Sequence, residues 1–183
     1  MTLNMLETRL ILKSTLLLTM RSPTYSLFLI TLFFAIVAIA NYGYLSFRPL
    51  DDPDDLHKEW MNRTMGTVFV ILGLLKLMNL REFAQIFSKY DIVAQRLSVY
   101  GYAYPFLEII LGLSFFVKDY REDAYKATIA LMTLGLVGVG STISSSQSLR
   151  CGCMGSLFHI PVSYVTVSEN LLMIGMSLYL QSL

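Results

Sequence analysis

Long apolar stretches alternate with short polar stretches along most of the chain. Five apolar stretches are long enough, or nearly so, to cross about 30 Å of hydrocarbon at about 1.5 Å per helical residue. Each should be a helix, because a bilayer offers the backbone no other hydrogen-bond partner. They are Tyr25–Tyr44, Thr64–Leu80, Tyr102–Val117, Ala127–Ile143 and Val162–Leu180. The pattern predicts an all-α integral membrane protein with five transmembrane helices.

The first 22 residues follow a different pattern, because charged residues interrupt and flank the apolar run Leu10–Met20. A cleavable signal peptide is one interpretation, but no small-residue cleavage site precedes Ser22. An amphipathic helix lying in the membrane interface fits the pattern better. We therefore expect an interfacial segment over residues 1–22 and a single transmembrane domain over residues 23–183.

The connections between the apolar stretches carry further signals. The stretch Phe47–Arg63, with two prolines and four aspartates, is interpreted as a solvated loop with Trp60 near the lipid headgroups. In Arg81–Pro105, apolar residues recur at three- and four-residue steps, which predicts a short helix on the membrane surface. Three glycines of the fourth predicted helix are expected to permit close helix contact, namely Gly135, Gly138 and Gly140.

Composition agrees with a membrane protein. Hydrophobic residues make up 55% of the 183 residues, which is above the usual range for soluble domains. The formal net charge is only +1, so the chain lacks the basic footprint of a nucleic-acid-binding protein, and no nucleic-acid partner is expected. The expected partner is the lipid bilayer.

Three ionisable residues lie inside the predicted helices, namely Lys76, Glu108 and Glu169. Counted from the nearer helix ends, they lie about 6, 9 and 12 Å deep, and the alternation of five spans puts all three in the same half of the bilayer. Charges at such depth cost about 2.5 to 3.5 kcal/mol each on insertion scales, so they usually face the bundle interior and pair. Lys76 and Glu108 are the expected pair. The alternative is that Lys76 extends to the interface while the glutamates only hydrogen-bond between helices.

The two cysteines of the chain, Cys151 and Cys153, are separated by one glycine in the sequence LRCGCMGS. The predicted topology puts this loop on the same side of the membrane as the ionic residues. A disulfide across so short a ring is strained, and strain makes it labile rather than structural. Three roles stay open: a redox pair, a soft-metal site, or two small inert residues. The metal site would bind Cu(I) through donors that suit it, namely Cys151, Cys153, Met154 and His159.

Three segments together carry a family resemblance: GLLKLMNLREFAQIFSKYDIVAQR (Gly73–Arg96), YGYAYPFLEIILGL (Tyr100–Leu113) and CGCMGSLFHIPVSYVTVSENLLM (Cys151–Met173). They resemble the MauE branch of the MauE/DoxX-like redox-associated membrane proteins. The resemblance covers residues 65–183 and implies a four-helix bundle, here preceded by one additional helix. It also implies a role in the maturation of methylamine dehydrogenase, through disulfide formation in a partner subunit. The matching positions are Cys151, Cys153, Lys76, Tyr104, Pro105, Glu108 and Glu169.

The resulting hypothesis is a thiol–disulfide redox or maturation factor that acts on a client protein through Cys151 and Cys153. Lys76 would favour the reactive thiolate by its positive charge, and Glu108 or Glu169 would relay a proton. A quinone is the candidate electron acceptor. Two alternatives stay open: a copper-binding or copper-transporting membrane protein that carries Cu(I), and a non-catalytic membrane assembly factor.

The distribution of basic residues does not decide the orientation. Seven lysines and arginines lie on the side of the C-x-C loop and six on the other side, and Lys76 completes the total of 14. The difference favours neither orientation strongly under the positive-inside rule. A cytoplasmic face would keep the thiols reduced, whereas disulfide formation requires an oxidising face. The sequence therefore leaves the compartment of the thiols open.

Overall fold

The computed structural model describes residues 23–47, 53–144 and 162–183 of the chain. Within these ranges every regular element is a helix, so the expected all-α class is confirmed. The helices are α2 (Pro23–Ser46), α3 (Pro53–Met78), α4 (Leu80–Phe87), α5 (Ile92–Arg96), α6 (Ser98–Ser114), the 3₁₀-helix η1 (Lys118–Tyr120), α7 (Arg121–Ser144) and α8 (Val162–Ser182). The expected interfacial segment, residues 1–22, lies outside the described residues.

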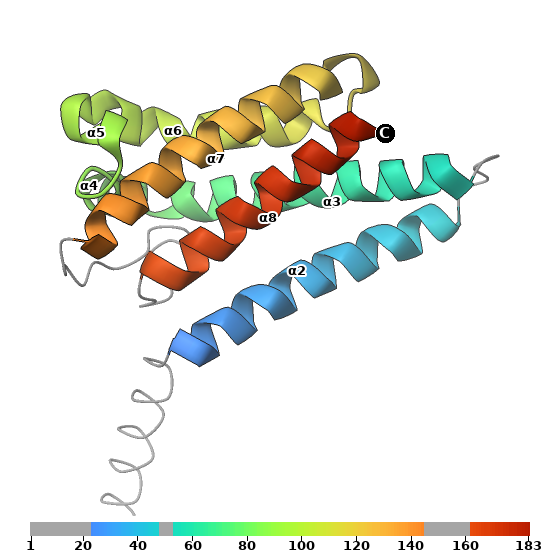
Figure 1. The fold of residues 1–183 in the computed structure, drawn as a ribbon, viewed down its shortest axis with the longest axis horizontal. Helices are drawn as coiled ribbons and strands as arrows, with labels where there is room; N and C mark the ends of the chain where they lie inside the picture. Colours follow the sequence, from blue (N-terminus) through green and yellow to red (C-terminus); the bar gives the residue numbers. More distant parts are fainter. Residues whose placement is uncertain (1–22, 48–52, 145–161) are drawn as a thin grey trace, which may run out of the picture.

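Four of the long helices, α3, α6, α7 and α8, pack together as a bundle (Figure 1). Helix α3 packs mainly on α6, and α7 packs mainly on α8. Helix α2 runs along the outside of the bundle, beside α3 and α8. The short helices α4 and α5 cover one end of the bundle next to α6 (Figure 1). The described chain therefore consists of a four-helix core with one long helix before it.

Two helical stretches in the described part of the chain are long and apolar enough to cross a membrane, namely Leu56–Met78 and Lys118–Ser141. Thr31–Ser46 is a shorter apolar helix. Large apolar side chains also point outward from α2, α6, α7 and α8, where lipid would cover them. Exposed examples are Ile36, Ile110, Val137 and Leu171. These features agree with a membrane protein, while the arrangement of five spans stays a prediction.

Helix α3 begins earlier than expected, so the interpretation of Phe47–Arg63 as a loop is wrong from Pro53 onward. Proline is favoured in the first turn of a helix, where its missing N–H has no intrahelical acceptor. Acidic residues are also favoured there, because they complement the helix dipole, and two aspartates follow Pro53 directly. The Pro-Asp-Asp sequence is therefore a helix start rather than a turn.

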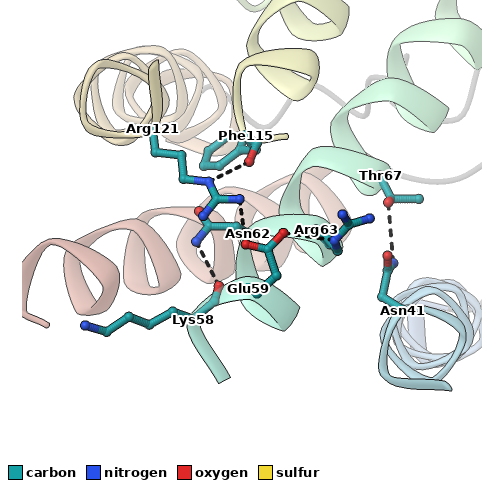
Figure 2. Close-up of polar contacts among 8 residues, drawn as sticks. All are labelled: Asn41, Lys58, Glu59, Asn62, Arg63, Thr67, Phe115 and Arg121. Carbon is teal, nitrogen blue, oxygen red and sulfur yellow. Dashed lines mark hydrogen bonds and ion pairs between the residues drawn. The ribbon is translucent and has the colours of Figure 1, made fainter. Parts of the chain in front are cut away.

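Helix α2 is fastened to α3 by two side-chain hydrogen bonds. The Trp60 indole N–H of α3 donates to the Ala38 carbonyl of α2 at 2.8 Å. The Asn41 amide of α2 donates to the Thr67 hydroxyl at 3.4 Å (Figure 2). Trp60 therefore lies between two helices and anchors α2, and it does not belong to a solvated loop.

Helices α3 and α6 approach each other backbone to backbone at glycines. A Cβ on Gly66 would lie 2.7 Å from the Gly112 carbonyl oxygen, and a Cβ on Gly112 would lie 2.8 Å from that of Gly66. A Cβ on Gly73 would lie 2.6 Å from Ile109. Small residues permit such close crossings between membrane helices. This crossing sets the register between α3 and α6, and with it the relative positions of Lys76 and Glu108.

The short helix expected in Arg81–Pro105 exists as α4, but its apolar face does not lie on a membrane surface. Phe83, Phe87 and Tyr90 are buried in an aromatic cluster with Tyr104 of α6. Tyr90 rests on Gly138 of α7, where an added Cβ would lie 2.6 Å from the Tyr90 carbonyl oxygen.

Two of the three glycines expected to permit close helix contact do so in the structure. Gly138 receives Tyr90, and Gly135 makes room for a side chain of α8. The expectation is wrong for Gly140 as far as the described residues go, since an added Cβ there would meet none of their atoms within 4 Å.

Candidate functional site

The three ionisable residues of the predicted helices meet inside the bundle. Lys76 lies in the last turn of α3, Glu108 in the middle of α6, and Glu169 near the start of α8. Their exposed fractions are 4%, 1% and 5%, respectively. All three line one cavity, so none of them faces lipid.

Lys76 and Glu108 form the expected ion pair. The Lys76 ammonium donates to Glu108 Oε1, and it also lies 5.2 Å from the ring centroid of Tyr104 and 5.7 Å from that of Phe83. Aromatic ring faces stabilise a desolvated cation. Lys76 is therefore held from two sides within the bundle, and the alternative in which it extends to the interface is wrong.

A cavity of about 20 Å³ is lined by both the ionic residues and the aromatic cluster. It is lined by Lys76, Phe83, Phe87, Tyr90, Tyr104, Glu108, Gly135, Thr166, Glu169 and Asn170. Such a volume holds about one water molecule. Glu108 Oε2 is buried and has no hydrogen-bond partner among the described protein groups.

Two polar residues of the cavity were not identified from the sequence. Asn170 and Thr166 of α8 are both buried and line the cavity beside Glu169. Asn170 fits there because its neighbour on α7 is Gly135, on which a Cβ would lie 2.8 Å from Asn170 Nδ2. The sequence signal was the amide directly after Glu169 within an apolar stretch, since polar groups inside membrane helices usually face other protein groups.

The segment that follows Tyr90, one of the residues lining the cavity, begins with Asp91. Its carboxylate accepts hydrogen bonds from the Val93 and Ala94 N–H groups, at 2.9 and 2.8 Å, and caps the N-terminus of α5. Burial raises the pKa of Asp91, and the two N–H groups act in the opposite direction. This cap holds the Tyr90 backbone against α7.

The C-x-C pair and the donors of the metal alternative, Cys151, Cys153, Met154 and His159, lie outside the described residues. The ends of the loop that carries them are described: α7 finishes at Ser144 and α8 begins at Val162. Glu169 is seven residues into α8, about 10 Å along the helix from this start. The loop therefore leaves and rejoins the bundle at the end that contains the cavity.

Among the described residues, no group of three or more His, Cys, Asp or Glu side chains could hold a metal ion. Tyr104 and Pro105, which match the family pattern, are both buried in α6. Tyr104 contributes a ring to the wall of the cavity, and the Pro105 carbonyl oxygen would lie 3.0 Å from a Cβ on Gly73.

A second ionic cluster lies at the opposite end of α3, about 25 Å from Lys76 along the helix. Glu59 accepts hydrogen bonds from Arg121 at 2.7 Å and from Arg63 at 3.0 Å (Figure 2). The Arg121 side chain also donates to the Phe115 carbonyl oxygen at 2.9 Å, and Arg63 lies 5.0 Å from the Tyr44 ring centroid. This cluster, the Glu59 cluster below, joins α3 to the connection between α6 and α7.

The fold and the buried site define a helical membrane protein with an ionic centre at one end of its bundle. The model of one protein family matches residues 58–182, from the first turns of α3 to the end of α8, and its description is methylamine utilisation protein MauE. The chain belongs to this MauE family. Neither the search of curated proteins nor the search of solved structures gave a match.

Proposed function

We propose that this protein is a membrane maturation factor that forms disulfide bonds in a partner protein through Cys151 and Cys153. The proposal rests on the family, whose description assigns it to methylamine utilisation, and on the C-x-C motif. In the proposed reaction, two thiols of the partner are oxidised to a disulfide while the Cys151–Cys153 disulfide is reduced to two thiols. A mixed disulfide between the two proteins is the intermediate.

The observation that carries the proposal is the burial of ionic residues at the end of the bundle where the C-x-C loop is attached. Packing alone favours apolar residues at these positions, because charged groups inside a membrane are costly and usually mark a functional site. The reduction of a disulfide takes up two protons with two electrons, so groups that exchange protons are useful at this end. Glu108 and Glu169 are the groups we propose for this task.

Lys76 has a more limited role in this proposal than the sequence suggested. Its ammonium is neutralised by Glu108 and screened by the Tyr104 and Phe83 rings. We therefore assign Lys76 the role of holding Glu108 in the bundle rather than of lowering the pKa of a thiol directly.

The proposed topology has five spans, formed by α2, α3, α6, α7 and α8, in a bacterial inner membrane. Helix α6 is the shortest of them at 17 residues, or about 25 Å, and the described helices carry outward-facing apolar side chains that suit lipid. Disulfide formation requires that the C-x-C loop face the oxidising side. A membrane-impermeant thiol reagent applied to intact cells tests this orientation. If the loop faces the oxidising side, Cys151 and Cys153 are labelled without cell lysis.

The function itself is tested by replacing both cysteines with alanine in cells that make the client protein. We expect the client to lose its disulfides, while the matched replacement of Met154 by leucine leaves them intact. Full maturation of the client without either thiol would overturn the proposal in favour of a non-catalytic assembly factor. Copper that copurifies with the wild type, and is lost with His159→Ala, would instead support the metal-binding alternative.

A further inference from the structure

The cavity between α3, α6, α7 and α8 has unequal numbers of acidic and basic groups. Lys76 is the cationic group that lines it, whereas Glu108 and Glu169 are both acidic. The remaining titratable groups of the lining are the phenols of Tyr90 and Tyr104, and α7 contributes only Gly135. With both carboxyl groups ionised, the site would carry one uncompensated negative charge.

Such a charge is costly at this position. Both glutamates are almost fully buried, and an unpaired charge inside a protein is disfavoured far more than the same group in neutral form. Two nearby carboxylates in one buried site also disfavour their joint ionisation, so one of them keeps a proton.

The structure offers a position for this proton at Glu108 Oε2 and the adjoining cavity. Glu108 uses Oε1 for the ion pair with Lys76, which leaves Oε2 as a buried acceptor with no partner among the described groups. The adjoining cavity holds about one water molecule, and its polar lining also includes Glu169 and Asn170. A water there can connect the two carboxyl groups.

We propose that this cavity is a proton-binding site, in which Glu108 and Glu169 share one exchangeable proton through a single water molecule. With this proton bound, the remaining negative charge balances the positive charge of Lys76. A metal cation fits less well, because it would have to lie beside the Lys76 ammonium. In addition, no third His, Cys, Asp or Glu joins the two carboxylates among the described residues. The use of this proton in disulfide chemistry rests on the proposed function. The number of protons bound in the site follows from its charged groups alone and does not depend on the thiols.

The charge count makes a separate prediction for each variant. The wild type should hold one protonated carboxyl group in the site at neutral pH. Glu169→Gln and Glu108→Gln should each hold none, because the remaining carboxylate is balanced by Lys76. Lys76→Met should hold two, because both carboxyl groups then lack a cation. Glu122→Gln, which changes an exposed acid at the start of α7, should leave the count at one.

Infrared spectroscopy of the full chain in lipid nanodiscs tests this count through the C=O stretching band of protonated carboxylic acids. The measurement uses a Cys151→Ser/Cys153→Ser background, so its outcome is independent of thiol chemistry and a failure here is distinguishable from a failure of the proposed function. We expect the wild-type band at neutral pH, its shift in D₂O, and its loss in Glu169→Gln.

Two results would overturn the proposal. One is a wild type without such a band at neutral pH, which would mean that the site tolerates both charges. The other is a wild-type band that disappears when sodium replaces a bulky organic cation in the buffer, which would mean that a metal ion neutralises the site. The wild-type measurement decides the matter even where Lys76→Met fails to fold.

Discussion

The two ends of α3 carry ionic clusters of opposite composition. At one end, one lysine and two glutamates line a small cavity, and all three side chains are buried. At the other end, one glutamate faces two arginines (Figure 2), and its contacts are partly open, with exposed fractions of 15% for the Glu59 side chain and 13% for that of Arg121. Both oxygens of Glu59 are bonded, whereas Glu108 Oε2 has no partner. In the Glu59 cluster, both carboxylate oxygens have hydrogen-bond partners. In the cluster around Lys76, one carboxylate oxygen can still accept a hydrogen bond.

This difference supports our proposal that the Lys76 end of the bundle is the functional end. A partly open, fully bonded cluster joins helices and contributes little beyond that, because exposed ion pairs stabilise proteins only weakly. A buried cluster with an unpaired acceptor is energetically costly, which supports the chemical role that we propose for it. The buried cluster is also the one at the end where the C-x-C loop joins the bundle.

The largest expected effect is the loss of stability on replacing Lys76 with methionine. The change leaves two buried carboxyl groups without a cation and should cost about 3–5 kcal/mol of unfolding free energy. The deficit should shrink as the pH falls, because a protonated carboxyl group is easier to bury. Unfolding in detergent at several pH values measures it. Adding Glu108→Met to Lys76→Met should recover much of the loss, and a double variant as unstable as the single one would contradict the pairing.

A smaller effect is expected from Gly73→Ala, which puts a methyl group against Ile109 where α3 crosses α6. Overpacking of this kind costs about 1–3 kcal/mol. Because Gly73 lies near the Lys76 end, its cost should add to that of Glu59→Gln rather than couple with it. Gly140→Ala serves as the control, since its Cβ would meet nothing within 4 Å. Equal losses at Gly73 and Gly140 would show that the crossing is not tightly packed.

Glu59→Gln should cost about 1 kcal/mol at low salt, since the ion pairs of Glu59 are partly open to solvent and glutamine can still accept one hydrogen bond. Salt screens such pairs, so the difference from the wild type should shrink as ionic strength rises. The cost of Lys76→Met should hardly change over the same range, because the Lys76–Glu108 pair is almost fully buried and salt screens buried pairs much less than exposed ones. Thermal unfolding in low and high salt compares the two ends directly, and equal salt sensitivity would remove the distinction between them.

The smallest effect concerns Asp91, which caps α5. Asp91→Ala should cost about 1 kcal/mol through loss of the cap. Asp91→Asn retains an acceptor for Val93 and Ala94. Because burial raises the pKa of Asp91, the native carboxyl group favours folding more when protonated, and its contribution declines as the pH rises. Asn should therefore match or exceed Asp in stability at pH 8 and lose that advantage below about pH 4. Unfolding curves of both variants against pH provide the comparison.

Much of the fold could be predicted from hydrophobic periodicity alone. The five long helices overlap the five predicted stretches, because runs of apolar residues leave few other backbone solutions in a bilayer. The predicted stretch for α3 begins too late because the first turns of the helix are charged. A Pro-Asp-Asp sequence can begin a helix as well as form a loop. The inward face of α4 could not be distinguished from a lipid-facing one, since both environments select the same apolar side chains.

Part of the site could also be predicted from the sequence. The estimated depths of Lys76 and Glu108 in the membrane predict that the two residues lie close together. These depths can be estimated because the ends of both helices can be estimated from the sequence. Asn170 was missed because its role depends on the space left by Gly135, and a packing relation between α7 and α8 has no local pattern. The positions of Phe83 and Tyr90 in the cavity lining likewise depend on how α4 and the residues after it pack on α6 and α7.

The most direct test of the proposed function is to trap the mixed disulfide with the client. In cells that make the client, Cys151→Ala and Cys153→Ala are prepared singly, and free thiols are blocked before non-reducing electrophoresis. The remaining thiol can attack a disulfide of the client, in the reverse of the proposed exchange, which releases one client thiol and leaves no second cysteine to resolve the product. We therefore predict that one of the two variants accumulates a reducible adduct with the client. The adduct should persist when Glu59→Gln is added and decline when Glu169→Gln is added. If neither single variant forms an adduct, while both thiols of the wild type remain reduced, the protein does not exchange disulfides with its partner.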